Sequence, residues 1–247
     1  MPSSAFEPCR PSTTLASCRA EVVFDVVFFD CDSTLSTLEG IDELAREAGA
    51  LEEFAQLTRD AMSGRVKLEE VYGKRLARVR PNRESLQRVA EAYCETVVPG
   101  AEDTIATLLA KGVEVHVVSG GLLPAVRAIA LQLGVPEAQV HAVDVIFDEA
   151  GEYAGFDESS PLARSGGKPA LCETLLGGRR GAIVGDGITD AEAAPPCELF
   201  VGFGGVAARE AVRARAGAWV PGPSLTGVLD HLLSEDARQV AADRSKS

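Results

Sequence analysis

The sequence has few basic residues for its length. Among 247 residues there are 24 lysines and arginines against 37 aspartates and glutamates, so the formal net charge is −13. A protein with this charge is repelled by nucleic acid and by anionic membrane surfaces. We therefore expect neither as a partner, and we expect a small-molecule substrate instead. An anionic substrate would need a local concentration of cations, which makes any Lys or Arg near a candidate site informative.

Long apolar runs and paired cysteines are also missing. No apolar stretch approaches the roughly 18 residues that a membrane-spanning helix requires. The six cysteines are scattered, without a C-x-x-C pair or a Cys/His cluster, which favours reduced thiols and a cytoplasmic location. Residues 1–20 lack the apolar centre of a secretory signal and are predicted to form a disordered leader. Delivery to an organelle through this leader is the alternative.

An apolar run over residues 22–29 is followed at once by the segment D-C-D-S-T. A run rich in Val and Phe predicts a strand buried on both faces of a parallel sheet. Ligands of open α/β sheets bind beyond the carboxyl ends of the strands, where Asp30 and Asp32 stand. Two carboxylates this close repel each other, and Mg²⁺ is the usual remedy because it prefers oxygen ligands. The alternative is that both aspartates only cap the next helix.

The segment that follows, residues 36–97, is helical in pattern throughout. It has little β-branched content and no alternation, and turn signals at Ser63-Gly64 and Pro81-Asn82 divide it. We predict a small helical cap inserted after the first strand, placed where a lid would exclude water from the aspartates. The α/β core domain then comprises residues 21–35 and 98–235.

Beyond the insertion, predicted strands and helices alternate. This order predicts an α/β fold with a Rossmann-like parallel sheet flanked by helices and joined by right-handed crossovers. A turn signal within residues 145–156 also predicts a β-hairpin. The predicted helices are residues 101–111, 123–133 and 225–233, and the predicted strands are residues 113–118, 140–145, 182–184, 199–203 and 219–220.

Other predicted strand ends carry polar or glycine-rich residues. Ser119-Gly120-Gly121 offers a hydroxyl and backbone N–H groups, Asp186 and Asp190 lie in the segment GDGITD, and Lys168 opens a helix. Each feature alone is usually a turn or a surface charge. Together they supply what phosphoryl transfer requires, namely a carboxylate nucleophile and cations that neutralise a phosphate ester of about −1.5 to −2 charges.

The order D-x-D-S-T, S-G-G, G-G-K and G-D-G-x-T-D resembles the haloacid dehalogenase superfamily of phosphatases. Longer segments, among them EGIDELA, LTRDAMSG, YGKRLARV and GEYAGFDE, resemble the phosphoserine phosphatase family over residues 22–233. The resemblance implies a Mg²⁺-dependent phosphomonoesterase. We expect a monomer or homodimer. It would hydrolyse O-phosphoserine to serine and phosphate through an aspartyl phosphate, as the last step of serine biosynthesis. The alternative substrate is another small phosphorylated metabolite, such as phosphoethanolamine or phosphothreonine.

The same resemblance implies a role for each matching residue. Asp30 is the nucleophile, Asp32 the general acid and then the base, and Lys168 neutralises the developing charge. Mg²⁺ is held by the Asp30 carboxylate, the Asp32 main-chain carbonyl and Asp186, with Asp190 in support. The residues implied to contact the substrate are Glu39, Met62, Arg75, Ser119, Gly120, Gly121, Thr189 and Arg209.

From the sequence alone, several of these residues can also be assigned purely structural roles. Glu39 fits the first turn of a helix, where it would favour the macrodipole, and Arg75 fits the exposed face of an amphipathic helix. Met62 fits a core position. Cys31 is expected to pack rather than react, because its acidic neighbours raise its pKa. A haloacid dehalogenase is disfavoured by Asp32, since a halide leaving group needs no acid, and a catalytically silent binding module is disfavoured by the full set of reactive groups.

Overall fold

The computed structural model describes residues 23–62, 65 and 68–233. The predicted leader and the turn at Ser63-Gly64 lie outside the described residues. A sheet of six parallel strands forms the centre, in the order β3-β2-β1-β6-β7-β8. The predicted α/β fold with a Rossmann-like sheet is therefore confirmed. The strands are β1 (Val26–Phe29), β2 (Glu114–Leu122), β3 (Val140–Val143), β6 (Gly181–Gly185), β7 (Leu199–Phe203) and β8 (Ala218–Val220).

Strand β1 lies in the middle of the sheet because its side chains are apolar on both faces. All four residues of VVFF are fully buried, and the strand pairs with β2 on one side and β6 on the other. The predicted apolar run began earlier, at residue 22. The strand begins only after Asp25, whose exposed carboxylate accepts the backbone N–H of Arg180 at the amino edge of the sheet.

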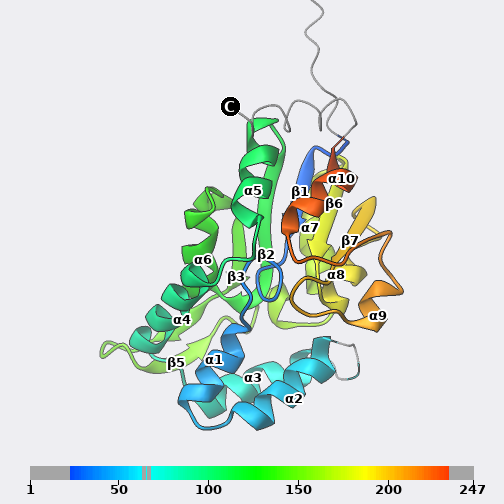
Figure 1. Cartoon of the computed structure of the whole chain (residues 1–247). Coiled ribbons are helices and arrows are strands. Elements are labelled where there is room, and N and C mark those ends of the chain that lie inside the picture. The colour runs from blue at the N-terminus through cyan, green and yellow to red at the C-terminus, as the bar shows by residue number, and fades with distance from the viewer. Residues whose placement is uncertain (1–22, 63–64, 66–67, 234–247) are drawn as a thin grey trace, which may run out of the picture.

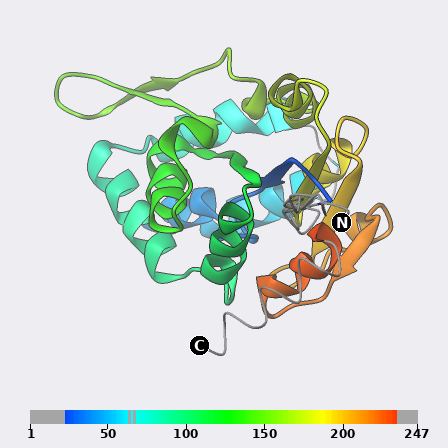
Figure 2. The same ribbon diagram turned by 90° about the horizontal axis from the view of Figure 1, so that it is seen from above.

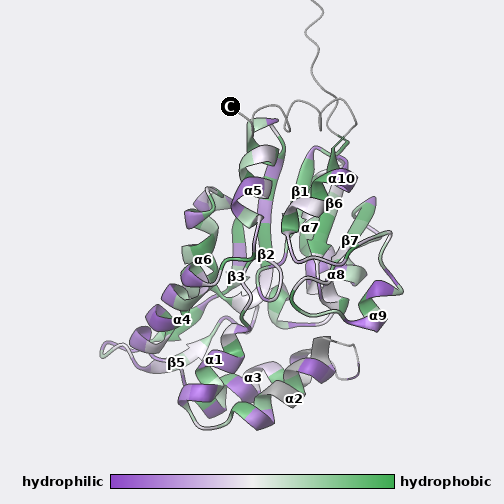
Figure 3. Cartoon of the chain, in the orientation of Figure 1, coloured by the Kyte–Doolittle hydropathy of each residue, from purple (hydrophilic) through white to green (hydrophobic). Residues whose placement is uncertain are grey.

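Helices flank the sheet on both sides (Figure 2). Their outward faces are polar and the strands between them are apolar (Figure 3). None of the described helices is both long and apolar enough to cross a bilayer. The helices are α1 (Gly40–Glu47), α2 (Leu51–Met62), α3 (Leu68–Val79), α4 (Arg83–Glu95), α5 (Ala101–Ala110), α6 (Leu123–Gln132), α7 (Gly167–Leu176), α8 (Ile188–Glu192), α9 (Glu210–Arg213) and α10 (Leu229–Leu232), with 3₁₀ turns η1 (Glu137–Gln139), η2 (Pro161–Ala163) and η3 (Leu225–Val228).

The helices between β1 and β2 occupy two different places. In Figure 1, α1, α2 and α3 gather beyond the carboxyl edge of the sheet, whereas α4 lies along α6. The apolar side chains of Leu86, Val89 and Tyr93 on α4 belong to the same core as the sheet, while Phe54 on α2 packs in a separate small cluster. The division of the chain into core and cap at residues 36–97 stays a prediction.

Two predicted elements differ in detail from the structure. The predicted strand 140–145 is split between β3 and β4 (Val145–Phe147), which pairs antiparallel with β5 (Tyr153–Phe156) as the predicted hairpin. Asp144 causes the break, because its carboxylate accepts the N–H of Val145 and its carbonyl accepts that of Asp157. The predicted helix 225–233 is a 3₁₀ turn, η3, followed by the short α10.

Candidate active site

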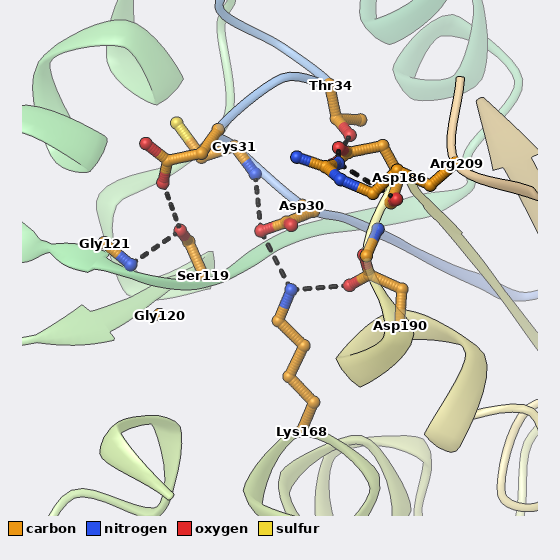
Figure 4. Close-up of polar contacts among 12 residues, drawn as sticks. Asp30, Cys31, Thr34, Ser119, Gly120, Gly121, Lys168, Asp186, Asp190 and Arg209 are labelled. Atoms are coloured by element: carbon orange, nitrogen blue, oxygen red, sulfur yellow. Dashed lines mark hydrogen bonds and ion pairs between the residues drawn. The ribbon is translucent and has the colours of Figure 1, made fainter. Parts of the chain in front are cut away.

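The carboxyl ends of β1, β2 and β6 meet the first turn of α7 at one place (Figure 4). Asp30 follows β1, Asp186 follows β6, Asp190 lies on α8, and Lys168 lies in the first turn of α7. All four side chains are buried. The structure thus brings together the charged residues that the strand-end pattern predicted.

Lys168 is the cation at the centre of this cluster. Its Nζ lies 2.8 Å from Oδ1 of Asp30 and 2.5 Å from Oδ1 of Asp190. Burial alone would lower the pKa of Lys168, but the charges of Asp190 and Asp30 raise it, so the amine stays protonated. Gly167 lets α7 start this close to the site, since a Cβ there would lie 1.6 Å from the carbonyl oxygen of Pro161.

Three buried carboxylates form a set of hard oxygen donors. One oxygen each from Asp30, Asp186 and Asp190 lie within 4.8 Å of one another. Burial and the charge of Asp30 raise the pKa of Asp190 to about 7, although Lys168 and the N–H of Gly187 act in the opposite direction. Gly185 makes room, because a Cβ there would meet the Asp190 carboxyl at 2.2 Å. Crowded, buried carboxylates of this kind suit Mg²⁺, which requires oxygen ligands and supplies the missing positive charge.

Asp186 also contacts side chains from two other loops. Its Oδ1 accepts the hydroxyl of Thr34 at 3.3 Å. Arg209 forms an ion pair with its carboxylate and donates to its main-chain carbonyl at 3.1 Å. The same guanidinium lies 3.2 Å from Oε1 of Glu39. Arg209 therefore joins the acidic cluster to a residue that the sequence assigned to the substrate.

Asp32 faces away from the three-carboxylate cluster. Its Oδ1 accepts the N–H of Gly40 at 2.7 Å and the hydroxyl of Tyr93, and its Oδ2 accepts the hydroxyl of Ser119 at 3.3 Å. Burial and then the charge of Asp30 raise its pKa. Because Gly40 is the first residue of α1, the capping alternative is partly right for Asp32. The predicted metal contact through the main-chain carbonyl of Asp32 stays a prediction.

The segment Ser119-Gly120-Gly121 lies within β2 rather than in a turn after it, because the strand continues to Leu122. The hydroxyl of Ser119 accepts the N–H of Gly121 at 2.9 Å, and the carbonyl of Gly120 accepts the hydroxyl of Tyr72 at 2.9 Å. A Cβ at Gly121 would lie 2.8 Å from Oδ2 of Asp32, so glycine is required for the two segments to approach.

Arg75 is buried and Glu39 is half-buried beside the charged cluster. Glu39 is the N-cap residue of α1, so its carboxylate does stand at a helix start, as the structural alternative expected. It makes no side-chain cap bond to the helix and instead accepts the hydroxyl of Ser33 at 2.8 Å. Burial and the charge of Asp32 raise its pKa to about 7. Arg75, on α3, is only 5% exposed, so its reading as a surface residue is wrong.

Burial lowers the pKa of Arg75, and acidic neighbours that include Asp42 and Glu39 act to raise it. Thr189 is half-buried on α8, next to Asp190. Met62 is the last residue of α2, and its side chain lies outside the described part of the structure. Cys31 is fully buried in the core, and burial together with the charges of Asp32 and Asp30 raises its pKa well above the ordinary value.

Comparison with known proteins agrees with this geometry. Residues 24–196 match the family model of haloacid dehalogenase-like hydrolases. Phosphoserine phosphatase of Bos taurus is 40% identical over 195 residues, which cover 78% of this chain and 87% of the relative. The chain belongs to the phosphoserine phosphatase family of haloacid dehalogenase-like hydrolases.

Other family members are similar at greater distance. Phosphoserine phosphatase of Methanocaldococcus jannaschii is 32% identical over 72% of this chain and 84% of its own length. A solved substrate-bound phosphoserine phosphatase complex superposes with a TM-score of 0.76 at 28% identity, over 86% of this chain and all of that one. A phospho-aspartyl intermediate analogue of phosphoserine phosphatase superposes with a TM-score of 0.75 at 29% identity, over 85% of this chain and 99% of that one.

Several residues of the site were not among those predicted from the sequence. Ser33 and Thr34 belong to the D-x-D-S-T motif, so the motif itself was a signal for them. Tyr72 lies on α3, as the first residue of the segment YGKRLARV that resembles the family, and Tyr93 lies on α4, outside the segments that carry the resemblance. The sequence therefore offered a signal for Tyr72, and none for Tyr93 beyond its place in an amphipathic helix.

Mg²⁺ should stabilise the folded protein through the three carboxylates. A ligand that binds only the folded state at 100 times its dissociation constant adds about 2.7 kcal/mol. We expect millimolar Mg²⁺ to raise the thermal unfolding midpoint of the wild type and to have little effect on Asp186→Asn, which removes one charged ligand. Glu137→Gln, an exposed surface change, is the matched control and should keep the full shift. An equal Mg²⁺ shift in Asp186→Asn would contradict the assignment of the site.

Proposed function

We propose that this protein is a Mg²⁺-dependent phosphatase that hydrolyses O-phosphoserine to serine and phosphate, the last step of serine biosynthesis. The observation that carries the proposal is the position of the Asp30 carboxylate, buried at the end of the central strand and held by Lys168 beside Asp186 and Asp190. Membership of the phosphoserine phosphatase family supports the substrate.

Asp30 is fixed in place for attack on phosphorus. Its Oδ1 accepts the N–H of Cys31 at 2.8 Å and lies 2.8 Å from Nζ of Lys168. In the first step a carboxylate oxygen of Asp30 bonds to phosphorus, the bond from phosphorus to the seryl oxygen breaks, and that oxygen takes a proton from Asp32. The products are serine and an aspartyl phosphate on Asp30.

In the second step water attacks the phosphorus of the aspartyl phosphate. Asp32, now a carboxylate, takes the proton of this water, and the bond from phosphorus to Asp30 breaks to release inorganic phosphate. The raised pKa of Asp32 suits a group that must first give and then accept a proton. A bound Mg²⁺, held by Asp30, Asp186 and the Asp32 main-chain carbonyl with Asp190 in support, would neutralise charge on the phosphate.

We assign the binding of the phosphate oxygens to the carboxyl end of β2 and to Lys168. The hydroxyl of Ser119 lies 3.3 Å from Oδ2 of Asp32 and accepts the N–H of Gly121. Figure 4 shows Lys168 beside Asp30, near Ser119. The positive charge of Lys168 balances the charge that develops as the phosphoryl group moves.

The serine part of the substrate is assigned to residues from the helices over the sheet edge. Glu39 would pair with the substrate ammonium and Arg75 with its carboxylate, since a guanidinium presents a fork of donors that fits a carboxylate. The Arg75 side chain is buried and the Glu39 side chain is half-buried. Met62, Thr189 and Arg209 are the remaining proposed contacts. The ion pair of Arg209 with Glu39 supports a place for Arg209 near the proposed ammonium site.

We propose the cytoplasm as the compartment, with the enzyme a monomer or homodimer. A relative from Arabidopsis thaliana is named a chloroplastic phosphoserine phosphatase, so delivery to an organelle through residues 1–20 is the alternative.

Replacement of the nucleophile should abolish the reaction. We expect Asp30→Asn to lower phosphate release from O-phosphoserine by more than about 10³-fold, because the amide cannot form the covalent intermediate. Asp103→Asn on α5 makes the same chemical change away from the site and should keep wild-type activity. The assay is phosphate release with Mg²⁺ and with EDTA, alongside circular dichroism to show that the fold survives. Unchanged turnover in Asp30→Asn would end this proposal.

A substitution of Arg75 tests whether the enzyme recognises the carboxylate of phosphoserine. Two charge-assisted hydrogen bonds at about 1.5–3 kcal/mol each predict that Arg75→Ala lowers kcat/KM for phosphoserine by at least about tenfold. Phosphoethanolamine has no carboxylate, so its hydrolysis should change little. Arg78→Ala, one turn along the same helix and exposed, is the matched control. If phosphoserine turnover is untouched in Arg75→Ala, carboxylate recognition is rejected and the alternative substrate is favoured.

A further inference from the structure

A tyrosine from α4 reaches the catalytic acid. Tyr93 is 1% exposed, and its hydroxyl donates a hydrogen bond to Oδ1 of Asp32 across 61 residues of sequence. The ring belongs to the same apolar core as Leu86 and Val89 of its own helix. Because the ring is held by packing, the hydroxyl has a fixed position against the carboxyl group.

The two oxygens of Asp32 have different surroundings. Oδ1 accepts two donors, the Tyr93 hydroxyl and the N–H of Gly40 at 2.7 Å, and both come from helices. Oδ2 faces β2, where the hydroxyl of Ser119 lies 3.3 Å away and a Cβ at Gly121 would come within 2.8 Å. One oxygen is therefore anchored, and the other is directed to the strand edge assigned to the phosphate.

Gly40 provides a second observation that the Tyr93 contact is built into the fold. A Cβ at residue 40 would lie 2.3 Å from the hydroxyl oxygen of Tyr93 and 3.0 Å from its ring carbon Cζ. The φ angle of Gly40 is not in the left-handed region, so the backbone itself does not require glycine there. The close approach of the Tyr93 hydroxyl is what excludes a side chain.

We propose that Tyr93 is a positioning residue for the proton transfer to the leaving group. It holds Oδ1 of Asp32 so that Oδ2 faces the seryl oxygen, which takes the proton from Oδ2 as the bond from Asp30 to phosphorus forms and the ester bond breaks. The proposal rests on the proposed function. Tyr93 contacts neither substrate nor the reacting atoms and acts only through the orientation of Asp32.

The proposal predicts a dependence on the leaving group. An alkoxide such as that of serine needs a proton when it leaves, whereas p-nitrophenolate leaves without one. Misorientation of Asp32 should therefore slow formation of the aspartyl phosphate from O-phosphoserine and have little effect on its formation from p-nitrophenyl phosphate. If Tyr93 served only to keep the protein folded, its loss would lower both rates by the same factor.

The test compares Tyr93→Phe with Tyr153→Phe, which removes a hydroxyl from the hairpin strand β5. For each protein kcat/KM is measured with both substrates, because this constant reports the steps up to the first release of product. We expect Tyr93→Phe to lower kcat/KM for O-phosphoserine about tenfold or more and for p-nitrophenyl phosphate less than about twofold. Tyr153→Phe should stay within about twofold of the wild type on both.

A second variant, Gly40→Ala, disturbs the contact between Tyr93 and Asp32 from α1. The methyl group of Gly40→Ala should push the Tyr93 ring away from Asp32 and reproduce the selective loss on O-phosphoserine, and it carries the test if Tyr93→Phe fails to fold. Equal losses on both substrates, or no loss, would overturn the role of Tyr93. A wild type that hydrolyses neither substrate would instead overturn the proposed function.

Discussion

The contact between Lys168 and two buried carboxylates is the interaction on which the rest of the site depends. Charges removed from water are costly unless they are paired, and here one ammonium group is shared between Asp30 and Asp190 while Asp186 lies beside them. Two glycines near the site make this contact sterically possible. A Cβ at Gly167 would collide with the Pro161 carbonyl, and a Cβ at Gly185 would collide with the Asp190 carboxyl, so these glycines let the start of α7 pack against η2 and let Asp190 of α8 pack against β6.

The helices beyond the carboxyl ends of the strands contribute the remaining contacts of the site. The sheet supplies Asp30, Asp186 and the Ser119 segment, while α1 and α4 hold Asp32 by Gly40 and Tyr93. From α3, the hydroxyl of Tyr72 reaches the carbonyl of Gly120, and Arg75 lies one turn away on the same helix. The proposed acid, the phosphate segment and the proposed carboxylate site are thereby tied to the same set of helices. A change in their packing would disturb all three together.

Much of the fold and the charged cluster could be predicted, because they follow from local patterns. An apolar run followed by D-x-D indicates the carboxyl end of a central strand. Lys168, Asp186 and Asp190 follow patterns that predict the same carboxyl side of the sheet. The roles of Tyr72 and Tyr93 could not be predicted, since an amphipathic helix shows which face is buried but not which partner it meets. The ion pair between Arg209 and Glu39 likewise joins segments 170 residues apart. The split of the predicted strand 140–145 depends on hydrogen bonds of Asp144 that composition does not reveal.

The central claim is that this pattern of charge makes Asp30 the group that accepts phosphorus. The most direct measurement is mass spectrometry of the enzyme quenched in acid during turnover of O-phosphoserine with Mg²⁺, with the site of modification read from the peptide fragments. We predict a phosphoryl group on Asp30 that forms before free phosphate accumulates and disappears when the substrate is exhausted. A phosphoryl group on another residue, or release of phosphate with no phosphorylated chain at any time, would contradict it.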